Sequence, residues 1–205
     1  QGEYAGIYDA LVAGQTRKGD EQVVAIPEQA AALVAKALRL VRLQRLPNAE
    51  KKVAVMFWNY PPGEKNLSAS FLNLPRSLAV MLGALKEAGY SARPEEEVVL
   101  INSLQRLLAP FYRDDTAAQL EQLLRDGLAE KLSLKTYRAW FSTLPESVRR
   151  EMIAQWGEPE KSALIIRDKG EAFFVIPRFA AGNVIFTPQA PRGEKWVDKE
   201  KALYH

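Results

Sequence analysis

The order of hydrophobic and polar positions predicts a long helix and then a buried strand in the first third of the chain. From Pro27 to about Leu46, hydrophobic residues recur every three or four positions, as they do on one face of an α-helix. A proline suits the first turn of such a helix, because its missing N–H would have no partner there. After Pro47, residues 53–58 form a short apolar run without polar alternation, typical of a strand covered on both faces.

The next residues are expected to complete a β-α-β unit. Residues 59–66 contain two prolines and a glycine, so neither a helix nor a sheet can continue through them. Helical spacing returns after Pro75 and ends at Gly89, and we expect residues 90–93 to form the next strand. In such a unit, ligands bind at the loop that follows the carboxyl end of the first strand.

A helical block is predicted over residues 95–157, with helices at 95–108, 116–132, 134–141 and 143–157. The last of these opens with the spacing of a capping box, from Thr143 to Glu146, and ends at Gly157. Residues 163–167 and 172–176 form a predicted hairpin, and residues 183–186 a further strand. The expected fold class is therefore α/β: a Rossmann-like partial sheet with a helical insertion and a C-terminal β-hairpin plus strand.

Two parts of the chain are distinguished. Residues 1–26 mix glycines with polar positions and show no period, so we interpret them as a loosely structured lead or the remnant of a preceding domain. Residues 27–205 are interpreted as a single α/β segment. Because the chain begins at Gln1 rather than at a methionine, we expect it to be a fragment of a longer polypeptide.

Composition narrows the possible functions. The 205 residues are 47% hydrophobic, enough for a true core, and 28 basic against 25 acidic side chains leave a net charge of only +3. This balance gives no reason to expect nucleic-acid binding. No run approaches the roughly 18 apolar residues of a membrane span, and no signal peptide is recognisable, so a soluble chain is expected.

The chemistry of metals and nucleophiles is also restricted. The chain has no cysteine and a single histidine, His205, at its end. Disulfides, thiolate metal sites, a Ser-His-Asp triad and a histidine-rich zinc site therefore need residues that the body of the chain lacks. No metal site is expected, and His205 is the one candidate imidazole ligand.

Three further patterns are weighed against simpler interpretations. Gly63 and Lys65 lack the spacing of a phosphate-binding P-loop, so nucleotide binding is not expected. The acidic runs 95–97 and 114–115 stand at helix starts, where they complement the helix dipole, rather than forming an acid/base pair. A basic stripe follows the first helix, and it is either a solvated face or a surface for a partner or anion. Its residues are Lys36, Arg39, Arg42 and Arg45.

Two loops are harder to explain as scaffold alone. Asn-Tyr-Pro-Pro-Gly at 59–63 and Gln-Ala-Pro-Arg-Gly at 189–193 each follow a predicted strand directly. Prolines reduce the entropy lost when a loop is held in one shape, and glycines let the backbone approach a ligand. Arg192 adds a planar fork of donors that matches a carboxylate.

Taken in order, these residues resemble the large-subunit family shared by cobaltochelatase (CobN-type) and magnesium chelatase (H subunit). The resemblance covers roughly residues 27–205. Two departures affect the loops: Ala190 stands where the family usually has proline, and Leu67-Ser68 where it usually has a glycine soon after Asn66. The matching segments are 43–51, 53–66, 85–90, 140–145, 156–157, 182–184, 189–193 and 203–205.

The resemblance implies a part in inserting a metal into a tetrapyrrole. In the family this subunit binds the macrocycle, while ATP is hydrolysed by a separate AAA+ motor that works with an integrin-like subunit. The implied partners are the tetrapyrrole, those two subunits and the rest of the large subunit, in the cytoplasm. This segment would bind no cofactor itself, would be inactive alone, and would serve a complex that uses ATP and Co²⁺ or Mg²⁺.

The resemblance also implies site residues, although none is assigned a catalytic role. Arg192 would bind a substrate carboxylate. The residues expected to line or brace the macrocycle cleft are Asn59, Tyr60, Asn66, Gln189 and Arg192. The residues expected to shape the loops are Pro61, Pro62, Gly63, Pro191 and Gly193.

We favour an ATP-dependent cobaltochelatase of cobalamin biosynthesis. The alternative is a structural or docking module of a magnesium chelatase-type subunit. In that alternative the helical block and the basic stripe receive the motor subunits, and the segment never touches the macrocycle.

Overall fold

The computed structural model of the chain describes residues 14–19, 21–61, 63–69 and 71–189. The chain divides at Pro47 into two compact units, residues 1–47 and 48–205. The long helix that we grouped with the C-terminal segment therefore falls in the first unit. The described part contains no helix that is long and apolar enough to cross a membrane.

The first unit holds a short hairpin and the long helix. Strands β1 (Gly14–Thr16) and β2 (Val23–Ala25) pair antiparallel, and helix α1 (Pro27–Arg45) follows. Pro27 occupies the first turn and helix α1 ends where predicted. The hairpin gives residues 14–25 more regular structure than a loosely structured lead would have: a backbone bond from Arg17 to Gln22 closes the connection, and Gly19 supplies a positive φ of 115°.

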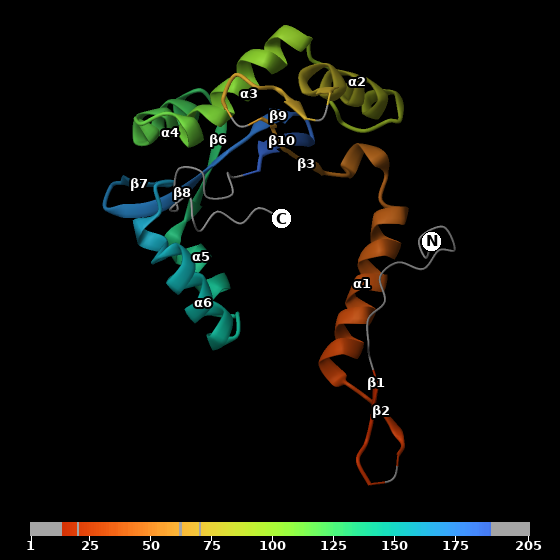
Figure 1. Cartoon of the computed structure of the whole chain (residues 1–205). Coiled ribbons are helices and arrows are strands. Elements are labelled where there is room, and N and C mark those ends of the chain that lie inside the picture. Colours follow the sequence, from red (N-terminus) through yellow and green to blue (C-terminus); the bar gives the residue numbers. More distant parts are fainter. Residues whose placement is uncertain (1–13, 20, 62, 70, 190–205) are drawn as a thin grey trace. The chain divides into compact units, whose positions relative to one another are not determined.

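The second unit contains a mixed three-stranded sheet in the order β3-β10-β9 (Figure 1). Strand β3 (Val53–Phe57) runs parallel to β10 (Val184–Pro188), and β9 (Phe179–Ala181) pairs antiparallel with β10. The expected β-α-β unit is wrong in its second strand. Residues 90–93 contribute only an isolated bridge from Ala92 to Gly182, and the parallel neighbour of β3 comes from the end of the described chain.

Strand β3 is also less covered than predicted. Its residues alternate between half-buried and exposed positions, and Met56 is 66% exposed. The apolar run therefore does not mark a strand buried on both faces, because only Val53, Val55 and Phe57, on one face of this edge strand, pack on the core. The run was interpreted from hydrophobicity alone, which cannot tell a buried face from one that lies bare.

A second sheet has the order β6-β8-β7, antiparallel throughout. It consists of β6 (Ala129–Ser133), β7 (Ile165–Asp168) and β8 (Glu171–Pro177). The hairpin β7-β8 is confirmed, with positive φ at Lys169 and Gly170 in its two-residue turn. Strand β6 was wrongly predicted as the end of a helix, because Leu132 continues the helical spacing by chance after Gly127 has already ended the helix.

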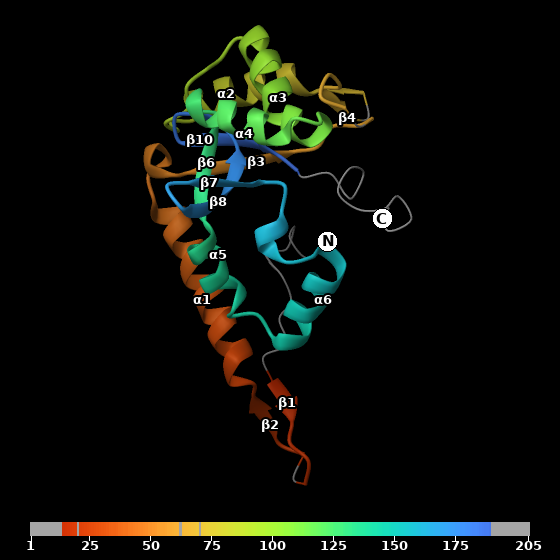
Figure 2. The ribbon, with the colours of Figure 1, turned by 90° about the vertical axis from the view of Figure 1, so that its left-hand side faces the viewer.

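Helices cover these sheets, and the core lies between them. Helix α2 (Leu74–Glu87) packs on α3 (Glu97–Tyr112), and α3 contacts α4 (Thr116–Arg125) and strands β9 and β10. In Figures 1 and 2, α2, α3 and α4 lie together beyond one side of the strands, while α5 (Leu134–Phe141) and α6 (Glu146–Trp156) lie on the other. The fully buried side chains include Leu82, Leu100, Leu104, Leu107, Leu120, Val184 and Phe186.

The remaining elements are short. A two-strand ribbon, β4 (Ser68–Ala69) with β5 (Leu72–Asn73), leads into α2, and single 3-10 turns occupy Asn48–Glu50 and Pro159–Lys161. The capping box expected at residues 143–146 is absent: the N-cap of α6 is Pro145, and Thr143 instead donates to the carbonyl oxygen of Trp140 at 2.7 Å. The expected stop at Gly157 is confirmed, with φ of 82°.

The amino ends of β3 and β10 are joined by a polar knot. Asn183 receives the amide of Val53 on its carbonyl and donates its own amide to the carbonyl oxygen of Ser91. Its side chain, like that of Ser91, donates to the carbonyl oxygen of Ala49. Gly182 lies so close to Ser91 that an added Cβ would overlap the backbone there, so this position requires glycine. The knot fixes the register of the two parallel strands.

Candidate functional site

The two proline-glycine loops begin side by side at one edge of the sheet. Strands β3 and β10 are parallel and in register to their last pair, Phe57 with Pro188. One residue further, the amide of Gln189 donates to the carbonyl oxygen of Phe57 at 2.8 Å. Because the carboxyl ends of parallel strands share one edge, Asn59 and Gln189, the first residues of the two loops, start from neighbouring points.

Asn59 holds the first loop closed rather than facing outward. Its side chain is 3% exposed, and its amide donates to the carbonyl oxygen of Gly63 at 2.8 Å. Its side-chain oxygen accepts a longer bond, 3.4 Å, from the hydroxyl of Tyr112 in helix α3. Since both ends of the amide are used within the protein, Asn59 is placed as a brace of the loop.

A second brace ties the loop to the end of α3. Arg113 donates from Nε to one carboxylate oxygen of Glu64 at 2.7 Å and from its terminal nitrogen to the other at 3.1 Å. This fork geometry fixes direction as well as distance. The hydrogen bond and charge of Glu64 raise the pKa of Arg113 above its ordinary value. No local pattern predicts this ion pair, because Glu64 and Arg113 lie far apart along the chain.

The remaining site residues of the first loop lie at the surface. Tyr60 is 58% exposed, and its backbone amide is held by the carbonyl oxygen of Ser68 at 2.8 Å. Pro61 and Asn66 are exposed, and Asn66 lies against Gly63, whose positive φ of 138° allows the loop to turn. Gln189 is half-buried on the neighbouring strand end. Tyr60 and Gln189 are thus the described residues best placed to meet a ligand.

Several predicted site residues lie outside the described residues. They are Pro62, Pro191, Arg192, Gly193 and His205. Among the residues that the structure describes, no three His, Cys, Asp or Glu side chains are grouped in a way that could hold a metal ion.

Two hollows with mixed polar and apolar linings flank the first loop. One, of about 430 Å³, is bordered by the Glu64–Arg113 pair, and the other, of about 400 Å³, lies beneath the β4-β5 ribbon. Lys65 lines both, although the sequence suggested no role for it beyond a failed P-loop. Gln189 lines neither, so these hollows belong to the first loop and α3 rather than to both loops.

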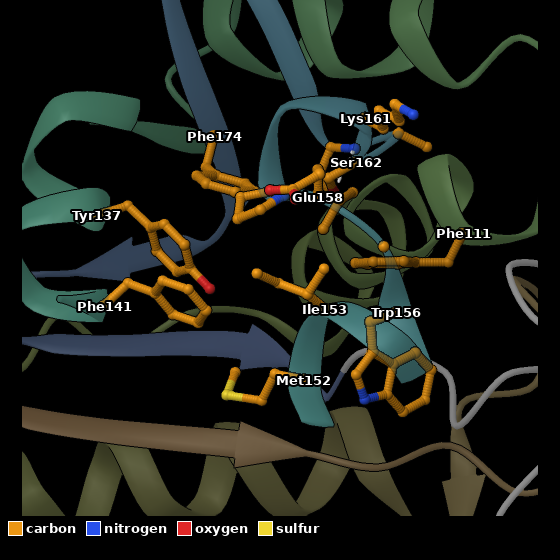
Figure 3. A pocket seen from close by; sticks show the side chains of 14 residues that line it. Phe111, Tyr137, Phe141, Met152, Ile153, Trp156, Glu158, Lys161, Ser162 and Phe174 are labelled. Atoms are coloured by element: carbon orange, nitrogen blue, oxygen red, sulfur yellow. Dashed lines mark hydrogen bonds between the residues drawn. The ribbon is translucent and has the colours of Figure 1, made fainter. Parts of the chain in front are cut away.

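A third pocket, of about 490 Å³, is mostly aromatic and aliphatic. Figure 3 shows Tyr137 and Phe141 of α5 on one side, with Ile153 and Trp156 of α6 across from them. The rings of Tyr137 and Phe141 are stacked with centroids 5.7 Å apart, and burial raises the pKa of Tyr137. Sequence reasoning missed this pocket, although the spacing of Tyr137 and Phe141 on one helix face was a usable signal.

Known proteins resemble this chain along its whole length. The CobN/Magnesium Chelatase family model matches residues 1–205. The aerobic cobaltochelatase subunit CobN of Pseudomonas aeruginosa is 34% identical over 131 residues, covering 62% of the chain, and that of a Sinorhizobium species is 28% identical over 204 residues, covering 98%.

A solved structure also agrees. The catalytic subunit of cobaltochelatase from Mycobacterium tuberculosis matches 88% of the chain with a TM-score of 0.63 and 27% identity. The chain spans only 10% and 14% of the two CobN relatives and 14% of the mycobacterial subunit. The ordered motifs, the family match and the shared fold lead to one conclusion: this chain belongs to the CobN/magnesium chelatase family.

Proposed function

We propose that this chain works as one part of a cobaltochelatase large subunit and forms a wall of its tetrapyrrole-binding site. The observation that carries the proposal is the parallel pairing of β3 with β10, which starts both proline-glycine loops at one sheet edge. The relatives that are named as cobaltochelatase subunits favour cobalt over magnesium. The parent complex would act in cobalamin biosynthesis in the cytoplasm.

Some residues of the two loops would hold the loops in shape, and others would contact the ligand. Asn59, Gly63 and the Glu64–Arg113 pair hold the first loop in one shape, so little conformational entropy would be lost when a ligand binds. Tyr60 would present an exposed aromatic ring to a flat macrocycle, and Gln189, which is hydrogen-bonded to Phe57, would add a side-chain amide at the same sheet edge. Arg192 follows three residues later and would pair with a carboxylate of the substrate.

Metal insertion needs groups that this chain does not bring together among its described residues. Two pyrrole protons must be accepted by bases, and a divalent ion must be delivered from oxygen or nitrogen ligands. We propose that the rest of the large subunit supplies these groups. ATP would be hydrolysed by an AAA+ motor that acts with an integrin-like subunit, and Co²⁺ would be the substrate ion.

Titration with a free-base porphyrin, followed by absorbance, tests the proposal in a large subunit that carries this chain. Arg192→Ala is expected to weaken binding about tenfold or more, because a charge-assisted pair is lost. Tyr60→Ala is expected to weaken it about threefold to tenfold through the lost ring contact. The matched control for Arg192→Ala is Arg150→Ala, which removes an exposed arginine of α6. A third variant, Gln189→Ala, removes the amide at the sheet edge, and its matched control is Gln155→Ala.

Two outcomes would count against the proposal. If the wild-type subunit shows no saturable spectral change, it does not bind this class of ligand. The second outcome is that the wild-type subunit binds porphyrin, Arg192→Ala and Gln189→Ala bind it as well as their controls do, and Tyr60→Ala binds it as well as the wild type. The sheet edge is then not the wall of the site.

A docking module remains the second candidate, and helix α1 is the feature that favours it. No residue of α1 is buried, and it carries exposed leucines and valines beside its basic side chains. Exposed apolar stripes of this kind mark surfaces for protein partners. Binding of the motor subunits without any porphyrin-dependent spectral change, lost in Lys36→Glu with Arg39→Glu, would support that function instead.

A further inference from the structure

Helices α5 and α6 enclose an apolar pocket with the features of a small-molecule site. Its volume, about 490 Å³, lies within the range of roughly 300 to 1,000 Å³ that is usual for ligand pockets. Most of its lining is aromatic or aliphatic, with a few polar groups at the margin. Pockets of this composition bind ligands by apolar contact and orient them with the polar groups.

The aromatic rings suit a flat ligand. Tyr137 stacks on Phe141 and contacts Phe174 with ring centroids 4.8 Å apart, which fixes its own ring. Across the pocket, Figure 3 shows Trp156 and Phe111 beside Ile153, so aromatic groups face one another from opposite sides. A planar conjugated ring could be contacted on both faces, and each aromatic contact adds to the gain from buried area.

The pocket walls also leave apolar surface uncovered. No residue of α5 or α6 is fully buried, and Trp156 is 52% exposed. Removing the apolar surface of a side chain as large as tryptophan from water lowers the free energy. A ligand in the pocket would cover this surface.

Charges at the pocket favour a ligand that carries a carboxylate. Arg149 does not line the pocket, but it stands on the α6 face that also holds the lining residues Ile153 and Trp156, and its Nε is buried without a hydrogen-bond partner. Lys161 lies at the exposed margin and forms no ion pair within the described part of the chain. The one acid that lines the pocket, Glu158, offers an acceptor for a ring N–H.

We infer that the pocket between α5 and α6 binds a planar conjugated ring that carries a carboxylate. Phe111 lines the pocket, and the next residue, Tyr112, donates to Asn59 of the first loop. The pocket is therefore connected through α3 to the braced loop at the sheet edge. The identity of the ring rests on the proposed function: it would be the edge of the tetrapyrrole, whose acidic substituents would reach Arg149 or Lys161.

Nuclear magnetic resonance of the whole chain, with naphthoate as a small planar carboxylate, tests the pocket directly. The indole N–H resonance of Trp156 is expected to shift and saturate as naphthoate is added. Trp140 is a matched control within the same spectrum, because it is equally exposed, 52%, on α5 but does not line the pocket. Lys161→Glu should weaken binding about threefold or more, while Lys135→Glu, at an exposed position of α5 outside the pocket, should not.

The inference is overturned if no indole resonance moves, or if Trp140 shifts as much as Trp156. A second titration with protoporphyrin separates it from the proposed function. A porphyrin affinity that falls about tenfold in Trp156→Leu, and not in Trp140→Leu, supports the inference. If Tyr60→Ala and Arg192→Ala weaken porphyrin binding and Trp156→Leu does not, the proposed function is supported and the inference about the pocket is wrong. If naphthoate binds at Trp156 but porphyrin does not bind at all, the pocket binds a planar carboxylate and the proposed function is wrong.

Discussion

The amide of Gln189 donates to the carbonyl oxygen of Phe57 at 2.8 Å, and this bond joins the starts of two loops that are far apart in the sequence. It extends the parallel pairing of β3 with β10 by one residue beyond the last strand pair. At the other end of the same strands, the Asn183 knot fixes the register. The sheet edge is thus defined from both ends.

Gly182→Ala tests the knot. The added methyl group would overlap the carbonyl of Ser91, and the positive φ of 70° is itself unfavourable for alanine, so a loss of at least about 2 kcal/mol in unfolding free energy is expected. Gly170→Ala is the control: φ is 84°, but nothing lies within 4 Å of the new methyl group, so the loss should be about 1 kcal/mol. Urea unfolding measures both, and equal losses would show that the close approach to Ser91 does not matter.

The features that depend on local chemistry could be predicted from the sequence. Helix α1 follows from its spacing and Pro27, and the β7-β8 turn from Lys169-Gly170. The mixed α/β class followed from such pieces. Strand partners could not be predicted in the same way: residues 90–93 follow α2 directly, yet the neighbour of β3 is β10, because sheet pairing is decided by packing between distant segments.

Predictions about the site met the same limit. The proline-glycine pattern located both loops, but it could not tell whether Asn59 would line the macrocycle cleft or brace it; in the structure its side-chain amide donates to Gly63 and closes the first loop. The aromatic pocket is lined by residues of α5, α6, β8 and the end of α3, so no single segment of the sequence predicts it. Local patterns identify rigid loops, whereas tertiary contacts decide which side chains face outward.

Asn59→Ala is expected to destabilise the protein by about 1 to 3 kcal/mol, because it removes a buried hydrogen bond to Gly63 and leaves the Tyr112 hydroxyl without its acceptor. Asn102→Ala, on an exposed position of α3, should change the unfolding free energy by less than about 0.5 kcal/mol. Thermal or urea unfolding compares the two. If Asn59→Ala lowers the unfolding free energy no more than Asn102→Ala does, the Asn59 side chain does not brace the loop.

Acid is expected to weaken the second sheet through Asp168. The hydrogen bond and charge of Lys131, at 2.6 Å, lower the pKa of Asp168 below its ordinary value. A carboxyl group with a lowered pKa stabilises the fold above its unfolded pKa, about 3.9, and this contribution is lost as the pH falls further. The urea midpoints of the wild type and Asp168→Asn should therefore differ at pH 6, and the difference should shrink as the pH falls below about 3.9. A difference that stays constant with pH would contradict the ion pair as its source.

The α5–α6 hairpin is expected to be less stable than α3. Neither α5 nor α6 has a fully buried residue, whereas α3 buries Leu100, Leu104 and Leu107 in the core. Amides in 134–156 should therefore exchange with solvent deuterium faster than those in 97–112. Mass spectrometry of exchanged peptides measures this, and exchange in α5–α6 that is as slow as in α3 or slower would contradict this order of stability.

Both proline-glycine loops are expected to leave one edge of one sheet, and a disulfide cross-link between β3 and β10 tests this arrangement. The chain has no cysteine, so a pair can be introduced without background at Met56 and Thr187, which are partners in the β3-β10 register. Neighbouring strands lie roughly 4.8 Å apart, within the range of a disulfide. We expect Met56→Cys with Thr187→Cys to oxidise to an intramolecular disulfide, detected by mass spectrometry, while Met56→Cys with Ile176→Cys, on the other sheet, stays reduced. Failure of the first pair to cross-link in the folded protein, or equal cross-linking of both, would contradict the shared edge.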